Sequence, residues 1–321
     1  MKTKIPVGIK SIGRYLPKKQ MNTVTGDGEK IIIHKAAKND TTYRMGAIAL
    51  ENAITIAEIN KEDLGHWLHC NDAPGDFLFQ LVGRKILDEI QIGSCHTYNL
   101  YQSSNCSLLA IKLLIDHLRN DPEGYIGGVS SSNNWENHTD NRKIGDAVLG
   151  DGAAVLLLEK GSNRYCFDAF TFKTMGKYHD IAAFKVGGYL EEINQKSIQE
   201  GRFKYSLINK KHYYELKKRS VEIGIEVVED TLKKAGISRN EIDLLVLHSQ
   251  TPQVSKELIE SLKISKDSVV ETVNCYGYMC SAGLLLSLHE AVYSLELPKN
   301  SKVLVTSIGI DGNWCAAIMT V

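Results

Sequence analysis

Cys106 and His248 are the two side chains whose types and positions best suit nucleophilic chemistry. Cys106 lies in Ser104-Asn-Cys-Ser-Leu-Leu-Ala, directly before an apolar pattern with helical spacing. The free N–H groups and the dipole at such a helix start favour a thiolate. His248 ends an apolar run that begins at Leu244, at the carboxyl end of an expected strand, where α/β sheets collect ligands. Together the two residues predict a thiol nucleophile with an acid–base partner.

Each of these residues also has a simpler interpretation. A lone cysteine in an apolar helix is most often a small buried hydrophobe. A lone histidine at a strand end is by default a core residue whose hydrogen bonds are satisfied. Only the pair, in one chain and at the expected turns, favours catalysis over packing.

The chain contains two copies of one plan. Ala235-Gly-Ile-Ser-Arg-Asn-Glu-Ile-Asp aligns with Ala57-Glu-Ile-Asn-Lys-Glu-Asp-Leu-Gly, which brings Cys70 under His248 and predicts a packing role for Cys70. Each copy closes on a glycine turn before an apolar strand. A repeat of this size indicates duplicated half-domains. We expect one half over residues 1–165 and the other over residues 166–321, with residues 171–212 inserted as a loop or lid.

The elements around these residues follow from periodicity. Apolar runs predict strands at residues 7–12, 67–69, 153–158, 244–247 and 303–306. Helical spacing predicts helices at residues 43–59, 76–90, 107–118, 213–234 and 280–295. Alternation of this kind predicts an α/β fold with a mostly parallel sheet. Asn60-Lys-Glu-Asp and Ser238-Arg-Asn-Glu have the spacing of a capping box before a strand.

Composition excludes several classes of protein. The chain has 321 residues, of which 43% are hydrophobic, and equal numbers of basic and acidic residues, 38 of each. Such a balance favours neither nucleic acid nor an anionic membrane as the main partner. The seven cysteines show no zinc-site spacing, so we expect no metal site and a reducing cytoplasm. No apolar run is long enough for a signal peptide or a membrane helix.

The order of the motifs resembles the thiolase superfamily, and within it the ketoacyl-ACP synthase III-like, or chalcone-synthase-like, branch. Ile9-Lys-Ser-Ile-Gly-Arg-Tyr-Leu-Pro is similar to the family's first strand and Tyr-Leu-Pro turn. Asp140-Asn-Arg-Lys-Ile-Gly-Asp-Ala-Val-Leu-Gly-Asp-Gly-Ala-Ala resembles its Asp-Arg and Gly-Asp-Gly-Ala signature. The resemblance covers nearly the whole chain and implies a five-layered thiolase fold that dimerises.

The resemblance also implies roles for single residues. Cys106 falls at the family's acyl-accepting cysteine and His248 at its catalytic histidine. Tyr278, in Gly-Tyr-Met-Cys-Ser, stands where the family has the asparagine that helps to hold the malonyl carbonyl while CO2 leaves. The backbone amides of Cys106, Gly309 and Ile310 are the expected oxyanion donors. The family's Trp- and Arg-containing segment for the coenzyme A nucleotide has no counterpart after the Tyr-Leu-Pro turn.

These residues predict an acyltransferase of the 3-oxoacyl-ACP synthase III type, of specialised metabolism, with no permanently bound cofactor. It would load an acyl group from a CoA or carrier-protein thioester on Cys106 and condense it with a non-standard acceptor. Plain acyl transfer to an alcohol or amine stays open, as does a non-catalytic subunit of a heteromeric complex. A homodimer is expected, with a heteromer of related subunits as the alternative. A basic cluster, which is either a solvated helix face or a docking surface for a carrier protein, comprises Lys210, Lys211, Lys217, Lys218 and Arg219.

Overall fold

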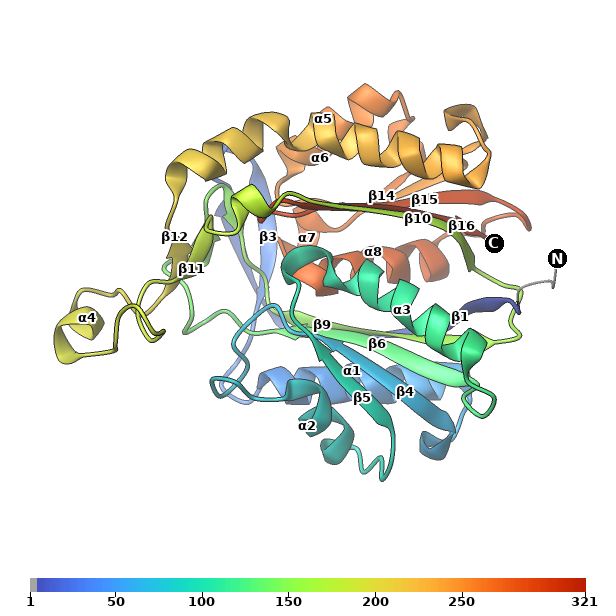
Figure 1. Cartoon of the computed structure of the whole chain (residues 1–321), viewed down its shortest axis with the longest axis horizontal. Helices are drawn as coiled ribbons and strands as arrows, with labels where there is room; N and C mark the ends of the chain where they lie inside the picture. Colours follow the sequence, from blue (N-terminus) through green and yellow to red (C-terminus); the bar gives the residue numbers. More distant parts are fainter. Residues whose placement is uncertain (1–4) are drawn as a thin grey trace.

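The computed structural model describes residues 5–321. Its helices and strands stack in five layers, with helices outside, in the middle and outside again, and sheet between them (Figure 1). This arrangement confirms the predicted α/β, five-layered fold. The helices of the layers are α3 (Cys106–Asn120) and α8 (Cys280–Ser294) in the middle, α1 (Thr42–Ala57) and α2 (Val82–Glu89) on one outer face, and α5 (Lys210–Ala235) and α6 (Pro252–Leu262) on the other.

The two sheet layers are the two halves of one continuous hydrogen-bonded sheet of ten strands. One half contains β1 (Val7–Tyr15), β4 (Leu64–Cys70), β5 (His96–Leu100), β6 (Ile126–Asn133) and β9 (Gly152–Lys160). The other contains β10 (Cys166–Thr174), β13 (Leu244–His248), β14 (Val269–Glu271), β15 (Lys302–Ile308) and β16 (Asn313–Thr320). A single residue pair, Gly8 with Cys166, joins β1 to β10.

Three apolar cores explain why the layers hold together. The inner core lies around α3 and α8, which pack against both sheets and are therefore apolar on most sides. The two outer cores bury one stripe of α1 and α2 and one stripe of α5 and α6 against the outer sheet faces. Burial of apolar surface is the main stabilising term for such a stack. The middle helices thus hold their N-termini in fixed positions.

The prediction of a mostly parallel sheet is wrong. In each half only two strand pairs are parallel, β4 with β5 and β6, and β13 with β14 and β15. The pairs β1–β9, β6–β9, β10–β16 and β15–β16 are antiparallel. A parallel connection needs a crossover of a dozen or more residues, whereas β15 returns to β16 through the short turn 309–312. The sheet is therefore mixed.

Local signals in the two copies have mixed outcomes. Both capping boxes are present, at Asn60 with Asp63 and at Ser238 with Glu241. The predicted helix over residues 76–90 is too long, because α2 begins at Val82. Before it, the Asp76 carboxylate accepts a hydrogen bond of 2.8 Å from the backbone N–H of Thr42 at the start of α1. Asp76 thus caps another helix instead of starting its own.

The inserted segment is shorter than expected at its start. Residues 171–174 belong to β10, so the insertion begins at Met175 and ends at Asn209, whose side chain caps α5. The segment adds β11 (Ala182–Phe184), paired with β12 (Tyr205–Leu207), and α4 (Gln195–Gln199), which stands away from the body (Figure 1). Other short elements are β2 (Lys19–Val24), β3 (Lys30–Lys35), β7 (Lys143–Ile144), β8 (Ala147–Val148) and α7 (Val273–Tyr276).

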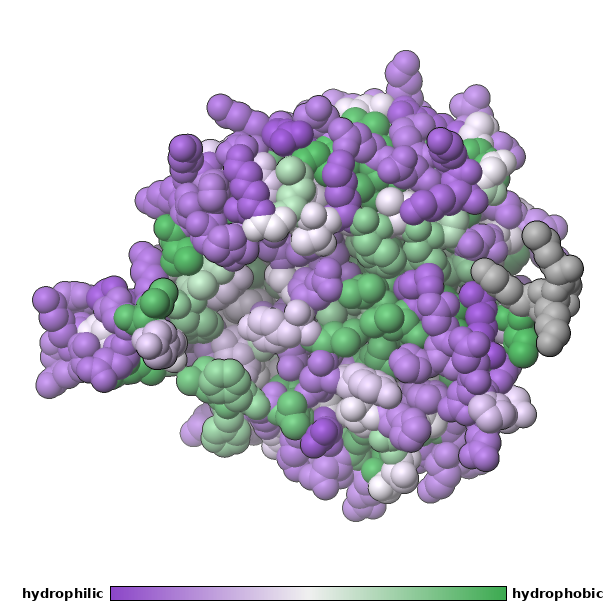
Figure 2. Space-filling view, in the orientation of Figure 1, coloured by the Kyte–Doolittle hydropathy of each residue, from purple (hydrophilic) through white to green (hydrophobic). Residues whose placement is uncertain are grey.

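The surface is mostly hydrophilic, but one apolar area lies over α3, between the two sheet layers (Figure 2). Leu113 of α3 is only partly buried there, and Tyr98 on the neighbouring β5 is exposed. Within residues 5–321, no helix combines the length and the hydrophobicity needed to cross a bilayer.

Candidate active site

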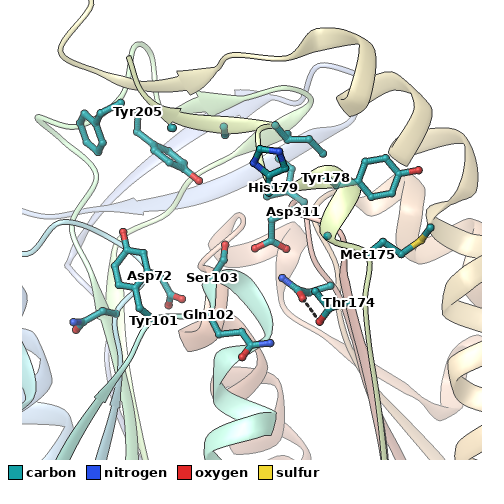
Figure 3. Close-up of a pocket in the computed structure, with 18 of the residues that line it drawn as sticks. Asp72, Tyr101, Gln102, Ser103, Thr174, Met175, Tyr178, His179, Tyr205 and Asp311 are labelled. Carbon is teal, nitrogen blue, oxygen red and sulfur yellow. Dashed lines mark hydrogen bonds between the residues drawn. The ribbon is translucent and has the colours of Figure 1, made fainter. Parts of the chain in front are cut away.

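A cavity of about 470 Å³ opens where α3 and α8 begin. Its floor includes Asp72, Ser103 and Asp311, and the inserted segment contributes β11 and Tyr205 of β12 to its wall (Figure 3). The floor residues come from the loop after β4, the turn before α3 and the turn after β15. Both halves of the chain therefore build the cavity. The lining residues lie where loops follow the carboxyl ends of strands, the usual place for a site in an α/β fold.

Helical structure begins at Ser103, three residues before α3. The 3₁₀ turn Ser103–Asn105 runs directly into α3, and the backbone N–H of Cys106 donates to the Ser103 carbonyl. Ser103 has φ 53°, a left-handed conformation that costs a non-glycine residue on the order of 1 kcal/mol. Its side chain lines the cavity. Strain of this kind concentrates where a fold must aim one side chain into a site.

Cys106 does not line the cavity. The side chain is fully buried in the inner apolar core, where it faces Cys70 at the end of β4. Burial raises the pKa of the Cys70 thiol well above its ordinary value, and the neighbouring Cys106 adds to that rise. No hydrogen bond joins Cys106 to His248 within residues 5–321. Cys106 was predicted to lie at the start of the helix. The 3₁₀ turn Ser103–Asn105 precedes it, so helical structure starts three residues earlier.

The second copy repeats this arrangement. α8 begins at Cys280, which has φ 49°, close to the φ of 53° at Ser103. Three residues later, Gly283 occupies the place that Cys106 has in α3, and a Cβ there would lie 2.4 Å from Cδ2 of His248. Glycine thus makes room for the His248 ring, just as Cys106 lies against Cys70. The predicted alignment of Cys70 with His248 agrees with these contacts.

His248 and Tyr278 form a stacked pair beneath the cavity. Their ring centroids lie 5.1 Å apart at an angle of 10°. Nδ1 of His248 hydrogen-bonds Ser307 Oγ at 2.8 Å, while its Nε2 and the Tyr278 hydroxyl are buried without a partner. Burial lowers the pKa of His248 to about 3, so the ring is neutral near pH 7. The structure therefore brings these two predicted residues together but leaves Cys106 outside the pair.

Asp72 is a half-buried residue whose carboxyl group lies at the start of α8. It accepts hydrogen bonds from the Ser281 backbone N–H at 3.0 Å, from Ser281 Oγ at 2.8 Å and from Ser131 Oγ at 2.8 Å. Burial nevertheless raises the pKa of Asp72 to about 7, because these donors offset only part of the desolvation cost. Asp72 thus ties the first half of the chain to the N-terminus of α8 and titrates near neutrality.

Asp311 occupies the corresponding place at the start of α3. Both carboxylate oxygens are buried and lack a partner with hydrogen-bond geometry within residues 5–321. The Ser103 hydroxyl lies next to them (Figure 3), as does the backbone N–H of Ser104. Burial raises the pKa of Asp311, and these neighbours oppose part of the rise. A serine hydroxyl beside a carboxyl group is the arrangement of a nucleophile with its base.

Comparison with known proteins gives the same family as the motifs. Residues 232–321 match the family described as 3-oxoacyl-[acyl-carrier-protein (ACP)] synthase III C terminal. The beta-ketoacyl-[acyl-carrier-protein] synthase III of Acaryochloris marina is 23% identical over 290 residues, which cover 89% of this chain and 84% of that protein. The chain is thus similar to ketoacyl synthase III proteins. The predicted resemblance to 3-oxoacyl-ACP synthase III, an acyltransferase-type enzyme, agrees with these matches.

Solved structures support the fold of this synthase III-like protein. The 3-oxoacyl-[acyl-carrier-protein] synthase III of Aquifex aeolicus superposes with a TM-score of 0.78 at 18% identity, covering 98% of this chain and all of that one. A structure named ChlB3, described as an acyltransferase, superposes with a TM-score of 0.79 at 18% identity and covers 98% of each chain. At this identity the likeness establishes the fold, and the chemistry must come from the site itself.

The expected oxyanion donors of the synthase III-like protein are largely in use. The Cys106 amide donates to the Ser103 carbonyl, and the Gly309 amide donates to the Asn313 carbonyl at 2.9 Å. The backbone amides of Ser104 and Asp311 lie next to the Asp311 carboxylate. The predicted donors Cys106 and Gly309 thus already donate within the protein, and the turn Gly309 to Gly312 supplies a carboxylate as well as amides.

Ser103, Asp72 and Asp311 were not predicted from the sequence. One signal was present: the internal alignment places Asp72 two residues after the strand-end position of His248, among loop residues that reach a site in such folds. Asp311 lies in the glycine turn that was singled out for its amides alone. Serine before a helix is so common as an N-cap that its type carries little functional information.

Proposed function

We propose that this protein is an acyltransferase that takes an acyl group from a CoA or carrier-protein thioester and carries it on Ser103 as an oxyester. One observation carries the proposal: Ser103 lines the cavity beside the Asp311 carboxyl, whereas Cys106 is sealed in the apolar core. The name of the similar ChlB3 structure, an acyltransferase, supports the same class. The acyl-carrying residue is thus a serine at the mouth of α3, three residues before the cysteine.

The residues at the start of α3 account for every proton and bond in the acyl-loading step. Asp311 accepts the proton of Ser103 while Oγ attacks the thioester carbonyl. The new bond joins Oγ to the acyl carbon, the carbon–sulfur bond breaks, and the proton passes to the departing thiolate. Once protonated, Asp311 is neutral and holds the amides of Ser104 and Asp311 less strongly, so these amides can donate to the oxyanion.

Decarboxylative condensation fits this site less well than acyl transfer. Malonyl decarboxylation produces an enolate, which needs donors aimed at developing negative charge. The Tyr278 hydroxyl is buried beside Ser104 beneath the cavity, and Asp72 and Asp311 place carboxyl groups at its floor. Condensation with a non-standard acceptor in specialised metabolism is the second candidate, favoured by the family of the named relatives.

A homodimer is part of the proposal. β5 is the last strand in the sheet order, so one edge of it has no strand partner within residues 5–321, and the apolar area over α3 lies beside it (Figure 2). An open edge next to apolar surface is typical of a face that another chain covers. Light scattering after size-exclusion chromatography tests this point, and a monomer at micromolar concentration would contradict it.

The basic cluster has mixed contacts, which bear on carrier docking. Lys217 pairs with Asp146 at 2.5 Å and Arg219 approaches Glu222 at 3.8 Å, while Lys210 and Lys211 are exposed. We keep carrier docking on Lys210 and Lys211 as a proposal. Exposed cations attract acidic carriers through long-range attraction that salt screens.

The decisive experiment is intact-protein mass spectrometry after incubation with a panel of acyl-CoA and acyl-carrier thioesters. The wild-type protein and Cys106→Ala should gain the acyl mass, and Ser103→Ala should not. Neutral hydroxylamine separates the chemistries, since it cleaves a thioester readily and leaves an ordinary oxyester in place. An adduct that hydroxylamine removes, and that persists in Ser103→Ala, would place the acyl group on a cysteine, with Cys106 and Cys280 as the residues to replace next.

A further inference from the structure

The cavity contains two carboxyl groups and no strong cation. Asp72 and Asp311 both line it, and His179 is the single basic side chain among the described lining residues. A buried carboxylate without a cationic partner is costly, which is why buried charges in proteins are nearly always paired. A cationic ligand would therefore compensate the excess negative charge of this cavity.

The cavity residues also have buried hydrogen-bond acceptors that lack donors. Both oxygens of Asp311 and Oδ1 of Asn71 are buried and lack a donor. Asn71 lies next to Asp72 in the loop after β4, whereas Asp311 comes from the turn after β15. A ligand with several N–H donors would satisfy acceptors of Asn71 and of Asp311.

Aromatic rings form the wall beside these acids. Tyr101 and Tyr205 flank the cavity on the side of Asp72 (Figure 3). Tyr205 lies 5.7 Å from both Trp135 and Phe184, measured between ring centroids, so the wall is a continuous aromatic surface. Aromatic faces attract cations and exclude water, and they hold the apolar part of a ligand. The combination of aromatic wall and acidic floor is typical of a site for an organic ammonium group.

We propose that the acyl acceptor is a primary amine, which binds as an ammonium ion between Asp72 and Asp311 with its apolar part against the aromatic wall. The inference rests on the proposed acyl transfer and specifies the acceptor of that same site. A neutral alcohol of the same shape would leave both carboxyl groups without a cationic partner. Within the described residues, no group of three or more His, Cys, Asp and Glu side chains is arranged to hold a metal ion.

The transfer step balances with these groups. Asp72, as a carboxylate, takes one proton from the bound ammonium and frees the nitrogen lone pair. The nitrogen attacks the acyl carbon of the ester on Ser103, so a carbon–nitrogen bond forms and the carbon–oxygen bond to Oγ breaks. A second proton moves from the nitrogen through Asp311 to Oγ, which restores the serine. The product is an amide, and Asp72 releases its proton to solvent.

Isothermal titration calorimetry without any acyl donor tests the inference. The probes are 2-phenylethylamine and 2-phenylethanol, which share their apolar part and differ in the donor group. We expect the amine to bind at least about tenfold more tightly than the alcohol at pH 8. Asp311→Asn and Asp72→Asn should each remove most of that preference, while Asp267→Asn, which changes an exposed acid in a remote turn, should leave it unchanged.

The outcomes separate this inference from the proposed function. Equal binding of amine and alcohol, or an amine preference that survives both aspartate substitutions, would overturn the amine inference even where acyl loading on Ser103 is intact. Circular dichroism checks that each variant is folded, and the two aspartate variants serve as substitutes for one another if one of them is not. A second assay adds 2-phenylethylamine to protein that has been acylated beforehand. Amide formation supports the inference, and hydrolysis alone with no amide contradicts it.

Discussion

Ser103 lies beside the carboxyl group of Asp311, although the first begins the helix of one half of the chain and the second follows a strand of the other half. This contact unites the two copies of the duplicated plan at one point. It also gives a hydroxyl group a base within the same buried site, while the nearby thiol of Cys106 has only another thiol, Cys70, as its neighbour.

Cys106→Ala should reduce stability and leave loading intact. Truncation of a fully buried side chain in a packed core costs on the order of 1 kcal/mol of unfolding free energy. Urea unfolding followed by fluorescence measures the loss, and intact mass spectrometry measures the acyl adduct. A variant with full stability and no adduct would return the nucleophile to Cys106.

His248→Ala should act through packing. The ring is buried and stacks on Tyr278, so its removal leaves a cavity that lowers the unfolding free energy by about 2–4 kcal/mol. Because the pKa of His248 is about 3, its titration should not appear in the rate profile between pH 5 and 8. A loss of turnover on the order of 10²-fold in a variant that keeps its stability would instead assign this histidine the acid–base role of the family.

Asp72 should make stability depend on pH in a direction opposite to that of a salt-bridged carboxylate. Its folded pKa of about 7 lies above the ordinary value of 3.8 for an aspartate, so the folded protein binds the proton more tightly than the unfolded chain. That contribution is fully present below about pH 4 and is lost as pH rises through 7. At about 1.4 kcal/mol per pKa unit, the loss is at most about 4 kcal/mol.

The comparison for this effect is Asp72→Asn, which cannot titrate. The difference in unfolding free energy between the wild type and this variant should shift in favour of the variant from pH 4 to pH 8. Burial raises the pKa of the thiols and phenols near Asp72, so they stay neutral over this range; they are Cys70, Cys280, Tyr101, Tyr205 and Tyr278. Asp311 is present in both proteins, so its own pH dependence largely cancels in the difference. A difference that stays constant with pH would contradict the raised pKa.

Malonyl thioesters should be poor substrates for decarboxylation. The resemblance places Tyr278 where an amide donor is expected, and its hydroxyl is buried next to Ser104. The wild-type protein should therefore release labelled CO2 from malonyl-CoA or malonyl-carrier far more slowly than it loads an acyl group, and Tyr278→Asn should raise the release if the variant folds. Release by the wild type at the rate of product formation would restore ordinary ketoacyl synthase chemistry.

The layered α/β plan and its duplication could be predicted from the sequence, but the directions of the strands could not. Apolar runs bounded by glycine turns, the two capping boxes at Asn60 and Ser238, and the alignment of Cys70 with His248 are local or repeated features. Local propensity and burial decide such features, so they can be predicted without knowing which segments meet. The resemblance to synthase III proteins came from other motifs, at residues 9–17 and 140–154.

Only the tertiary structure decided which residues face the cavity. One 3₁₀ turn before α3 rotates Ser103 into the site and Cys106 into the core, and sequence patterns do not fix such a turn to within three residues. Asp72 and Asp311 lie far apart in the chain and line one cavity because two helices from different halves begin beside it. Their raised pKa values follow from burial, which packing of the whole chain determines.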